Sequence, residues 1–414
     1  MFVLMLFLNF IVCFILKKLS IDNDIVTYFF VTVSFILMFF NIVNLKIDKK
    51  IKLILFVALI IRLIFVHVDI YLYRLPNAGS DDDAFYNTSI QIYNNQELFF
   101  SDNIYGNYFT KLLAIFYVFI GPNRVAVQSF NSMLSIISAI YLIKAMKNLN
   151  INEKKCFWIT LIILLMPNSI IMNSILRRET IMELLICLSI YSLTKWIRFK
   201  SKKDLIFTIL FLFIASLFHT VIIIGIVALF IYLLIINYLD KNKKVNVSTI
   251  IGITFIGAIS LLFVYYYVTN TGNRFSKFDS MDSIYDSINK TRGGSVYLES
   301  YKANSLKDVV IFLPLKLFCF FFSPLPWQWR NAMDAITFMT DSVIYLLLIV
   351  RYFYLNKNIN SKLFFWIFIV ISCVFSLGTF TSGTATRHRF TMLPFLLISY
   401  VICEKKKGAK NQNG

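Results

Sequence analysis

Residues 51–69 read IKLILFVALIIRLIFVHVD, an apolar run that follows the charged segment KIDKK at 46–50. A membrane-spanning helix needs about 20 mainly apolar residues, so this run is long enough to cross a bilayer. Arg62 near its middle is the exception. Comparable apolar runs, separated by short charged loops, recur along the whole chain, which predicts a bundle of membrane-spanning helices.

The composition supports a membrane protein. Hydrophobic residues make up 58% of the chain and charged residues only 15%, whereas soluble domains are about 45–50% apolar. This excludes a soluble cytosolic, nuclear or secreted protein. The net charge of +19 does not indicate nucleic-acid binding, because membrane proteins collect Lys and Arg in cytoplasmic loops. The N-terminal stretch 1–18 lacks a signal-peptide pattern and is expected to be the first span.

We therefore expect an all-α polytopic bundle of about twelve spans, within a range of roughly 11–14. The expected spans are 2–16, 25–42, 51–69, 125–143, 157–175, 180–194, 205–218, 220–238, 249–267, 337–351, 363–380 and 391–403. Two shorter or interrupted runs, 109–120 and 309–323, are expected to be interfacial or re-entrant helices.

The spans define one integral membrane domain over residues 1–404. Its expected parts are three N-terminal spans (1–69), a first outer loop (70–124), middle spans (125–267), a second outer loop (268–336), the last spans (337–403) and a basic tail (404–414). With a cytoplasmic N-terminus, the dense Lys/Arg clusters fall on the cytoplasmic side, as the positive-inside rule requires. The clusters lie at 46–52, 144–155, 195–203, 241–244, 351–362 and 405–410. Both termini are then cytoplasmic, and the plasma membrane is the expected location.

The densest acidic motif, GSDDDAFY at 79–86, falls in the first outer loop. Asp81, Asp82 and Asp83 are candidates for a catalytic carboxylate, because a carboxylate can act as general base on a sugar hydroxyl. Adjacent acids also raise one another's proton affinity. Two alternatives stay open: a solvated turn, and a site for a divalent cation such as Mg²⁺ or Mn²⁺, which prefers oxygen ligands. No cofactor is expected to be required.

A second motif, NSILRRET at 173–180, places Arg177, Arg178 and Glu179 between two apolar runs. Arg is unfavourable beside apolar spans on the outer side unless it has an anionic partner, and its planar guanidinium matches phosphate oxygens. These residues are candidates for phosphate or substrate binding. The alternative is that the arginines anchor the helix ends at the interface.

Three further motifs carry candidate residues on the same outer side. His219 separates two apolar runs and is a candidate catalytic group, or else a hydrogen-bonded helix-end residue. Arg387, His388 and Arg389 precede the last span and are candidates for a second anion-binding element. Trp327 and Arg330 are candidates for substrate contact, although Trp at a membrane interface is ordinary. The six cysteines form no CxxC pair and are expected to be buried small residues.

Together these motifs resemble two groups of membrane enzymes. The acidic motif DDDAFY and the segment NYFTKLLAIFYVFIGPNRVAVQSFNSMLSIISAIYLI look like the first outer loop of GT-C-type glycosyltransferases. The segments NSILRRETIMELLICLSIYSL, ASLFHTVIIIGIVALFIYLL and SGTATRHRFTMLPFLLI are similar to Wzy- and EpsG-type polymerases of O-antigen, capsule and exopolysaccharide. The resemblance covers roughly residues 70–400 and rests on the order of the motifs.

The resemblance implies a membrane glycosyltransferase that polymerises repeat units of a surface polysaccharide. It implies a polyprenyl-phosphate or -pyrophosphate-linked sugar donor, a glycan acceptor, membrane lipid around the helices and polysaccharide assembly proteins as partners, with no nucleic acid. In the resembled families an acid of this loop is the base, and outer arginines hold the pyrophosphate. A single-sugar transferase, a flippase or transporter of lipid-linked oligosaccharides, and a non-catalytic assembly partner are the alternatives.

Overall fold

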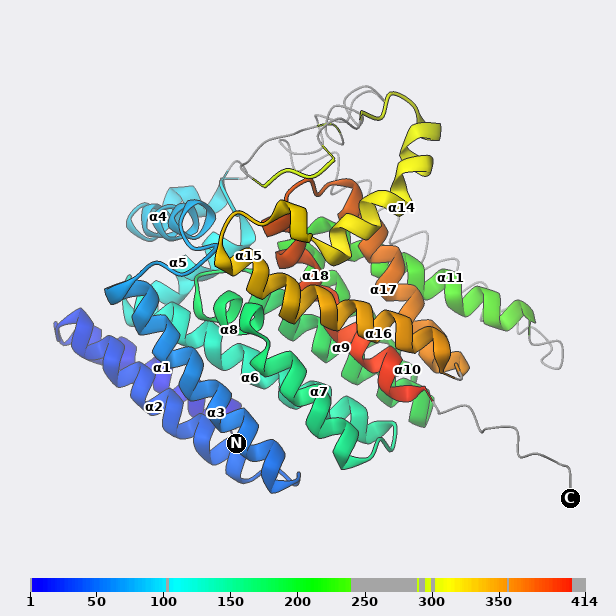
Figure 1. The fold of residues 1–414 in the computed structure, drawn as a ribbon. Coiled ribbons are helices and arrows are strands. Elements are labelled where there is room, and N and C mark those ends of the chain that lie inside the picture. Colours follow the sequence, from blue (N-terminus) through cyan, green and yellow to red (C-terminus); the bar gives the residue numbers. More distant parts are fainter. Residues whose placement is uncertain are drawn as a thin grey trace, which may run out of the picture. The chain divides into compact units, whose positions relative to one another are not determined.

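The computed structural model describes residues 2–101, 104–239, 289, 295–298, 302–355 and 357–403. Over these residues the regular elements are all helices, as Figure 1 shows, so the predicted all-α class is confirmed. The chain divides into two compact units. The first contains residues 1–144 and 152–188, and the second contains residues 145–151 and 189–414.

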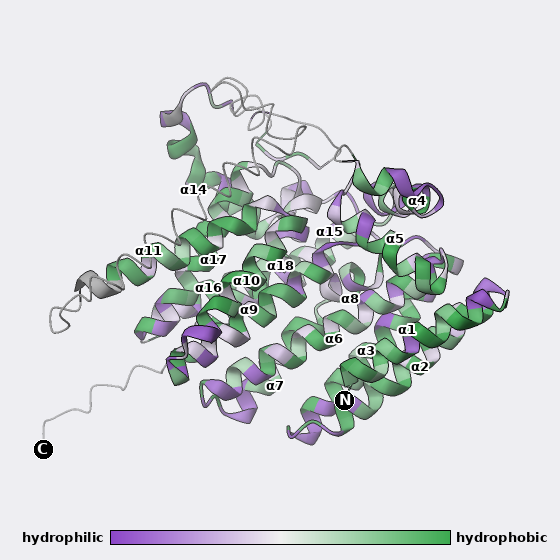
Figure 2. Cartoon of the chain, turned by 180° about the vertical axis from the view of Figure 1, so that it is seen from behind, coloured by the Kyte–Doolittle hydropathy of each residue, from purple (hydrophilic) through white to green (hydrophobic). Residues whose placement is uncertain are grey.

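Six helices in the described part of the chain are long and apolar enough to cross a membrane. They are Asn23–Val43, Lys49–Leu72, Arg124–Asn148, Glu179–Phe199, Ala332–Tyr354 and Ile359–Leu377. A bent pair, Glu153–Leu165 and Pro167–Ser174, gives a seventh if it is one span. These helices are largely green, or hydrophobic, in Figure 2.

The predicted total of twelve spans stays a prediction. The helices over the predicted spans 2–16 and 205–218 have 17 residues each, which is short for a span. The predicted span 249–267, much of the second outer loop and the tail 404–414 lie outside the described residues.

The first unit is built from helices that run back and forth past one another. Its elements are α1 (Phe2–Lys18), α2 (Asn23–Val43), α3 (Lys49–His67) with a π-helical turn η1 (Val68–Leu72), α4 (Ser80–Asn94), η2 (Gln96–Phe100), α5 (Tyr108–Ile120), α6 (Arg124–Asn148), α7 (Glu153–Leu165), α8 (Pro167–Ser174) and the start of α9 (Glu179–Phe199). α3 packs against both α7 and α8, and α5 packs against α1 and α4.

Short polar residues and one proline set the helix boundaries of this unit. Asp22, Asp48 and Asn152 accept backbone N–H groups at the starts of α2, α3 and α7, which satisfies donors that have no partner inside the helix. Pro167 begins α8, and the axis bends by 55° between α7 and α8. Proline fits the first turn of a helix but cannot continue the hydrogen bonding of a preceding one, so the run predicted as one span over 157–175 is broken there.

Aromatic rings fill the centre of the first unit. Phe10 of α1 lies 5.0 Å from Phe30 of α2, 5.5 Å from Phe116 of α5 and 5.8 Å from Phe130 of α6, between ring centroids. Tilted and edge-on rings at such distances are the favoured aromatic arrangement. The run 109–120, predicted as interfacial, is thus the helix α5, which packs one apolar face into this core.

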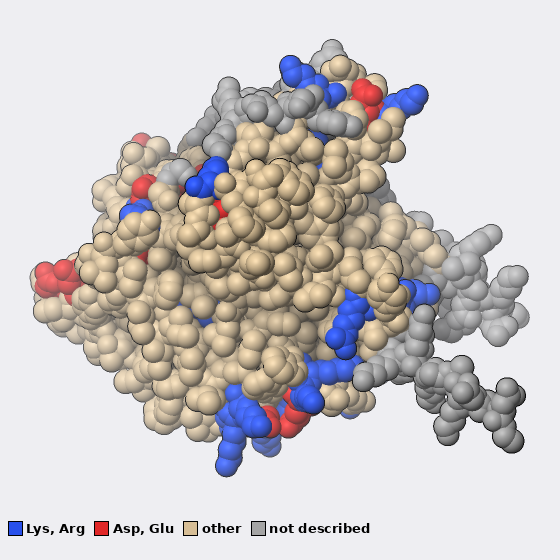
Figure 3. All heavy atoms as spheres, viewed as in Figure 1, with Lys and Arg blue, Asp and Glu red and all other residues tan. Residues whose placement is uncertain are grey.

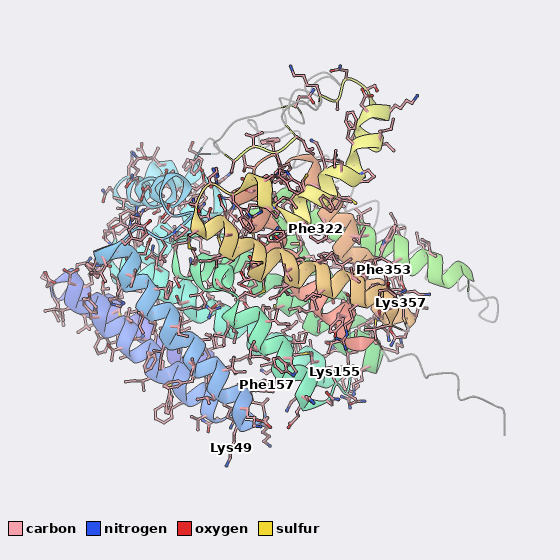
Figure 4. The ribbon with its side chains drawn as sticks, in the orientation of Figure 1. Lys49, Lys155, Phe157, Phe322, Phe353 and Lys357 are labelled. Carbon is pink, nitrogen blue, oxygen red and sulfur yellow. The ribbon has the colours of Figure 1, made fainter. Side chains whose placement is uncertain are left out.

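The two ends of the first unit differ in charge. Lys49, at the start of α3, and Lys155, in the first turn of α7, lie at the same end (Figure 4). In the same orientation, Figure 3 shows mainly Lys and Arg, with acidic residues among them, near the start of α7, and acidic residues over the turn between α1 and α2. The acidic motif at the start of α4 follows the C-terminal end of α3, so it belongs to the end away from Lys49.

The second unit contains the later helices. They are α10 (Lys202–Phe218), η3 (Thr220–Ile222), α11 (Ile223–Leu239), α14 (Leu306–Phe322), η5 (Pro326–Gln328), α15 (Ala332–Thr337), η6 (Phe338–Ser342), α16 (Val343–Tyr354), α17 (Ile359–Leu377) and α18 (Ser382–Ile402). α17 packs against α18, α11 and α14. α18 is buried along most of its length, and the run predicted over 309–323 forms the helix α14.

Gly121 ends α5 in a conformation that side chains avoid, with φ at +95°. A Cβ there would lie 1.8 Å from Oδ1 of Asn23, whose Nδ2 donates to the Pro122 carbonyl. Gly121→Ala is therefore expected to destabilise the protein by about 1–3 kcal/mol. Thermal unfolding in detergent measures this change. Gly378→Ala is the matched control, since its Cβ would meet nothing within 4 Å. Equal melting temperatures for the two variants would contradict the expectation.

Candidate functional site

The acidic triplet occupies the first turn of α4 in the first unit. Gly79 precedes the helix with φ at +106°, and its carbonyl accepts the N–H groups of Asp82 and Asp83. A glycine is required because this φ is strained for other residues. The triplet thus lies where the helix dipole favours negative charge. Local structure alone therefore accounts for part of the acidic motif.

Two arginines hold Asp82 and Asp83. Nη2 of Arg74 lies 3.2 Å from Oδ2 of Asp82 and 2.6 Å from Oδ1 of Asp83. Arg124, the first residue of α6, also pairs with Asp83 and lies 3.9 Å from Oδ2 of Asp82. Its guanidinium stacks 4.5 Å from the centroid of the Tyr86 ring. Asp83 therefore bridges two guanidinium groups that come from different parts of the chain.

A buried carboxylate orients Arg74. Asp69 in η1 has no exposed surface, and its Oδ2 lies 3.3 Å from Nη1 of Arg74. Gln128 of α6 donates to the same oxygen at 3.0 Å, and the N–H of Leu75 donates to Oδ1 at 2.9 Å. With these contacts Asp69 fixes the direction of Arg74 toward the triplet.

Arg177 pairs with the remaining aspartate of the triplet. Its Nη1 lies 2.9 Å from Oδ2 of Asp81, and its Nη2 donates to the carbonyl of Asn77. Asn131 of α6 holds the segment by donating to the carbonyls of Ile175 and Arg177. The predicted acidic and arginine motifs are thus in direct contact, although they are far apart in the sequence.

Asp81 and Arg178 complete the cluster. Tyr105 donates to Oδ1 of Asp81 at 2.6 Å. Arg178 lies 6.0 Å from the centroid of the Phe85 ring, and its Nε is 3.8 Å from Oε1 of Glu179. Glu179 is buried at the start of α9. We call Asp69, Arg74, Asp81, Asp82, Asp83, Arg124, Arg177, Arg178 and Glu179 the carboxylate–arginine cluster.

Asp82 and Asp83 differ in their affinity for a proton. Burial raises the pKa of Asp82, despite the opposing charges of Arg177 and Arg74. Burial also acts to raise the pKa of Asp83, but the hydrogen bond from Arg124 and the charges of Arg124 and Arg74 outweigh it, so this pKa is lowered. Neighbouring acids with opposite shifts are typical of sites that divide proton transfer from charge binding.

Oδ1 of Asp82 is buried and has no hydrogen-bond partner among the described residues. The other oxygen receives Arg74, so the cluster leaves one acceptor position on the carboxylate with the higher proton affinity. The side chain of Asp83 is instead 46% exposed, and its Oδ1 pairs with both Arg74 and Arg124. Asp82 is thus the member of the triplet that is best suited to accept a proton, and Asp83 the one best suited to hold positive charge in place.

A divalent cation at the triplet stays a prediction. Over the described residues no group of three or more His, Cys, Asp or Glu side chains is arranged to hold a metal ion. The aspartates of the triplet face guanidinium groups, which already offset their charge.

In the second unit, two of the predicted residues pack against each other. The rings of His219 and His388 lie 4.9 Å apart between centroids, and Phe375 of α17 stacks on His388 at 4.5 Å. His219 ends α10 and His388 belongs to α18. Arg387 is adjacent and partly buried. The predicted histidines thus belong to one aromatic cluster.

The remaining predicted residues of this unit differ in burial and in their contacts. Arg389 is buried, and its Nη1 donates to the carbonyls of Phe321 and Ser323 at 2.8 and 2.6 Å. Arg330 forms an exposed ion pair with Asp334 at 3.2 Å. Trp327 is 76% exposed. Arg389 therefore contacts backbone at the end of α14, whereas Arg330 and Trp327 remain open to the surroundings.

Sequence reasoning did not select Asp69, Arg74, Arg124 or Gln128. Asp69, Arg74 and Arg124 belong to the cluster, and Gln128 of α6 supports it by donating to Asp69. The sequence did indicate that Asp69 and Arg74 have partners, since ionisable residues at or just after the end of an apolar run are energetically unfavourable without them.

No protein-family model, curated protein or solved structure matches this chain.

Proposed function

We propose that the protein is a membrane glycosyltransferase that uses a polyprenyl-phosphate- or -pyrophosphate-linked sugar and extends a surface polysaccharide. The observation that carries the proposal is the carboxylate–arginine cluster at one end of a set of apolar helices. A phosphate-bearing lipid needs cations beside an apolar surface, and a sugar hydroxyl needs a base. The cluster offers both kinds of group within one unit.

In this proposal Asp82 is the general base. Its carboxylate has a raised pKa and an acceptor oxygen without a partner among the described residues. A base with proton affinity above that of an ordinary aspartate accepts the hydroxyl proton more readily as the sugar–oxygen bond forms. The anomeric carbon receives that oxygen, and the lipid (pyro)phosphate departs with the electron pair of the broken bond.

Arginines would stabilise the departing phosphate. Arg178 is held over Phe85, and Arg124 is held by Asp83. Because Asp83 is partly exposed, an incoming phosphate can replace its carboxylate on Arg124 and Arg74. Preorganised cations of this kind stabilise charge that develops in a transition state.

We also propose how the chain crosses the membrane. The chain would cross the plasma membrane about twelve times with both termini in the cytoplasm, as its Lys/Arg clusters predict. The cluster would then face outward, where a lipid-linked repeat unit meets the growing glycan. His219, His388 and Arg387 would form a second polar element in the other unit.

A transporter of lipid-linked oligosaccharides is the second candidate, and a specific observation favours it. Arg62 of α3 is buried, donates to Ser169 of α8 at 3.0 Å and interacts electrostatically with buried Glu183 of α9. Asn173 of α8 donates to Glu183 at 3.2 Å. Buried charges beside a broken helix are typical of transporters.

One experiment separates these candidates. The purified protein is reconstituted into vesicles with a polyprenyl-pyrophosphate-linked oligosaccharide, with and without EDTA, and the products are separated by size. A ladder supports a polymerase, and a single added sugar supports a single-step transferase. Movement of unmodified donor across the bilayer without new product would support the transporter. Loss of activity in EDTA would assign a divalent cation to the reaction.

The pH profile tests the assignment of the base. Arg74→Gln removes a charge that lowers the pKa of Asp82, so the acid limb of kcat/KM is expected to move to higher pH. The sign follows because activity requires ionised Asp82, and a higher pKa keeps it protonated over a wider range. The control is Arg330→Gln, which removes a charge in the other unit and is expected to leave the profile unchanged. A shift toward lower pH, or none, would contradict the assignment.

A further inference from the structure

A groove of about 720 Å³ opens in the first unit, between the end of α1, the end of α4, η2 and α5. α5 packs against α1 and α4, and η2 packs against α4; Figures 1 and 2 show α4 beside α5. Its volume lies within the roughly 300–1,000 Å³ typical of small-molecule sites. Its walls come from different elements from those that carry the triplet's arginine partners.

The walls of the groove are apolar along much of their length. Phe14 of α1, Ile92 of α4, Phe99 of η2 and Ile115 of α5 line it. Ile115 belongs to a stripe of α5 residues that are at least 40% exposed, together with Leu112 and Val118. An apolar stripe that continues into a groove fits a hydrocarbon chain.

Polar and basic groups gather at one rim. Asn94 and Gln96 line the groove beside Lys17 and Lys18, the last two residues of α1. Lys17 connects α1 to α4 and α5, because its Nζ donates to the Tyr93 hydroxyl at 2.7 Å and to the carbonyls of Tyr117 and Val118. Lys18 is exposed, with its Nζ 5.6 Å from the centroid of the Phe14 ring. Lys18 thus presents a positive charge beside the apolar walls.

We propose that this groove binds an anionic phospholipid, with one acyl chain along α5 and the phosphate on Lys18. The end of a membrane helix lies near the headgroup region, which places Lys18 at the depth of lipid phosphates. Lipid tails are as apolar as the groove, so transfer of an acyl chain from the bilayer into the groove gives little favourable free energy. Selection therefore depends on the headgroup charge, and the groove prefers anionic over zwitterionic lipid.

Lipid retention tests this proposal without any assay of transfer. The protein is extracted from vesicles of equal phosphatidylglycerol and phosphatidylcholine in mild detergent, and retained lipids are quantified by mass spectrometry. Phosphatidylglycerol is expected in at least fivefold excess. Lys18→Gln is expected to remove the excess, whereas Lys50→Gln, an exposed lysine at the start of α3, keeps it. Equal retention of the two lipids by the wild type would overturn the proposal, as would an unchanged excess in Lys18→Gln.

A second pair of variants tests the groove itself. Ile115→Trp fills it and is expected to lower retention of both lipids, whereas Leu53→Trp, at an exposed apolar residue of α3 outside the groove lining, leaves retention unchanged. The same loss in both variants would overturn the site. If added polyprenyl phosphate displaces phosphatidylglycerol, the groove belongs to the donor lipid and the proposal fails. Because no reaction is measured, these results are independent of the proposed transferase activity.

Discussion

Replacing Asp82 with asparagine is expected to lower the rate of glycosyl transfer by about 10²–10⁴-fold, the usual contribution of a general base. Asparagine has nearly the shape of aspartate, and its carbonyl oxygen can still accept Arg74. It cannot take the hydroxyl proton. The loss is therefore expected in kcat, while the KM for the lipid-linked donor changes little because the arginines stay in place.

Stability separates a catalytic loss from an unfolded protein. Burial raises the pKa of Asp82, which means that the folded state disfavours its charge. The Asp82→Asn protein is thus expected to have a melting temperature equal to or above that of the wild type. Asp83 has a lowered pKa, so its ionised form stabilises the fold above its unfolded pKa and this stabilisation is lost as the pH falls through its folded pKa. Asp83→Asn is accordingly expected to lower the melting temperature at neutral pH.

The control for Asp82 is Glu97→Gln, an exposed carboxylate in η2 of the same loop. Its transfer rate is expected to match the wild type. Transfer by Asp82→Asn at the wild-type rate would remove Asp82 from the reaction and leave Asp81 as the remaining candidate base of the triplet.

Arg389→Met is expected to cost about 3–5 kcal/mol of stability, the range for breaking a buried charge pair. Arg389 is 1% exposed, and its Nη1 lies within hydrogen-bond distance of the carbonyls of Phe320, Phe321 and Ser323. These carbonyls end α14, where the last turn lacks intrahelical donors. Asp341 interacts electrostatically with the same guanidinium, and its charge would be left buried without this cation.

A double variant measures how much of this effect comes from Asp341. Adding Asp341→Asn to Arg389→Met removes the uncompensated charge and is expected to recover part of the loss, with a coupling of about 0.5–3 kcal/mol. Arg330→Met is the control, since an exposed ion pair of this kind contributes about 0–1 kcal/mol. Thermal unfolding in one detergent compares the variants. If Arg389→Met and Arg330→Met have the same melting temperature, Arg389 does not stabilise the end of α14. That result would favour its predicted role in anion binding.

Much of the fold could be predicted from the sequence, since helix type and position depend on local pattern. The runs at 25–42, 51–69, 125–143 and 363–380 became long apolar helices with boundaries near those expected. The break at Pro167 was not expected, although proline is the local reason for it. The run 109–120 forms the 13-residue helix α5, and its predicted place outside the spans stays a prediction.

The candidate site was predictable only in part. The triplet and the Arg177 motif were found because charges are conspicuous beside apolar runs. Arg124 and Gln128 were missed because a single basic or amide residue near a helix start has no local signal, and the charge of Arg74 after an apolar run did not reveal its partners. Their significance depends on where α3 ends and where α6 begins in space. The contact of His219 with His388 likewise requires α10, α17 and α18 to pack together.

The sequence by itself determined that this chain is helical, rich in apolar segments and asymmetric in charge, because those properties follow from composition and the spacing of residues along the chain. Only the tertiary structure decided which cation neutralises which carboxylate. Asp81, Asp82 and Asp83 are neighbours in one helical turn, yet they face Arg177, Arg74 and Arg124 from three separate segments. Ionisation depends on burial and on charges a few ångströms away, so the adjacent residues Asp82 and Asp83 acquired opposite pKa shifts.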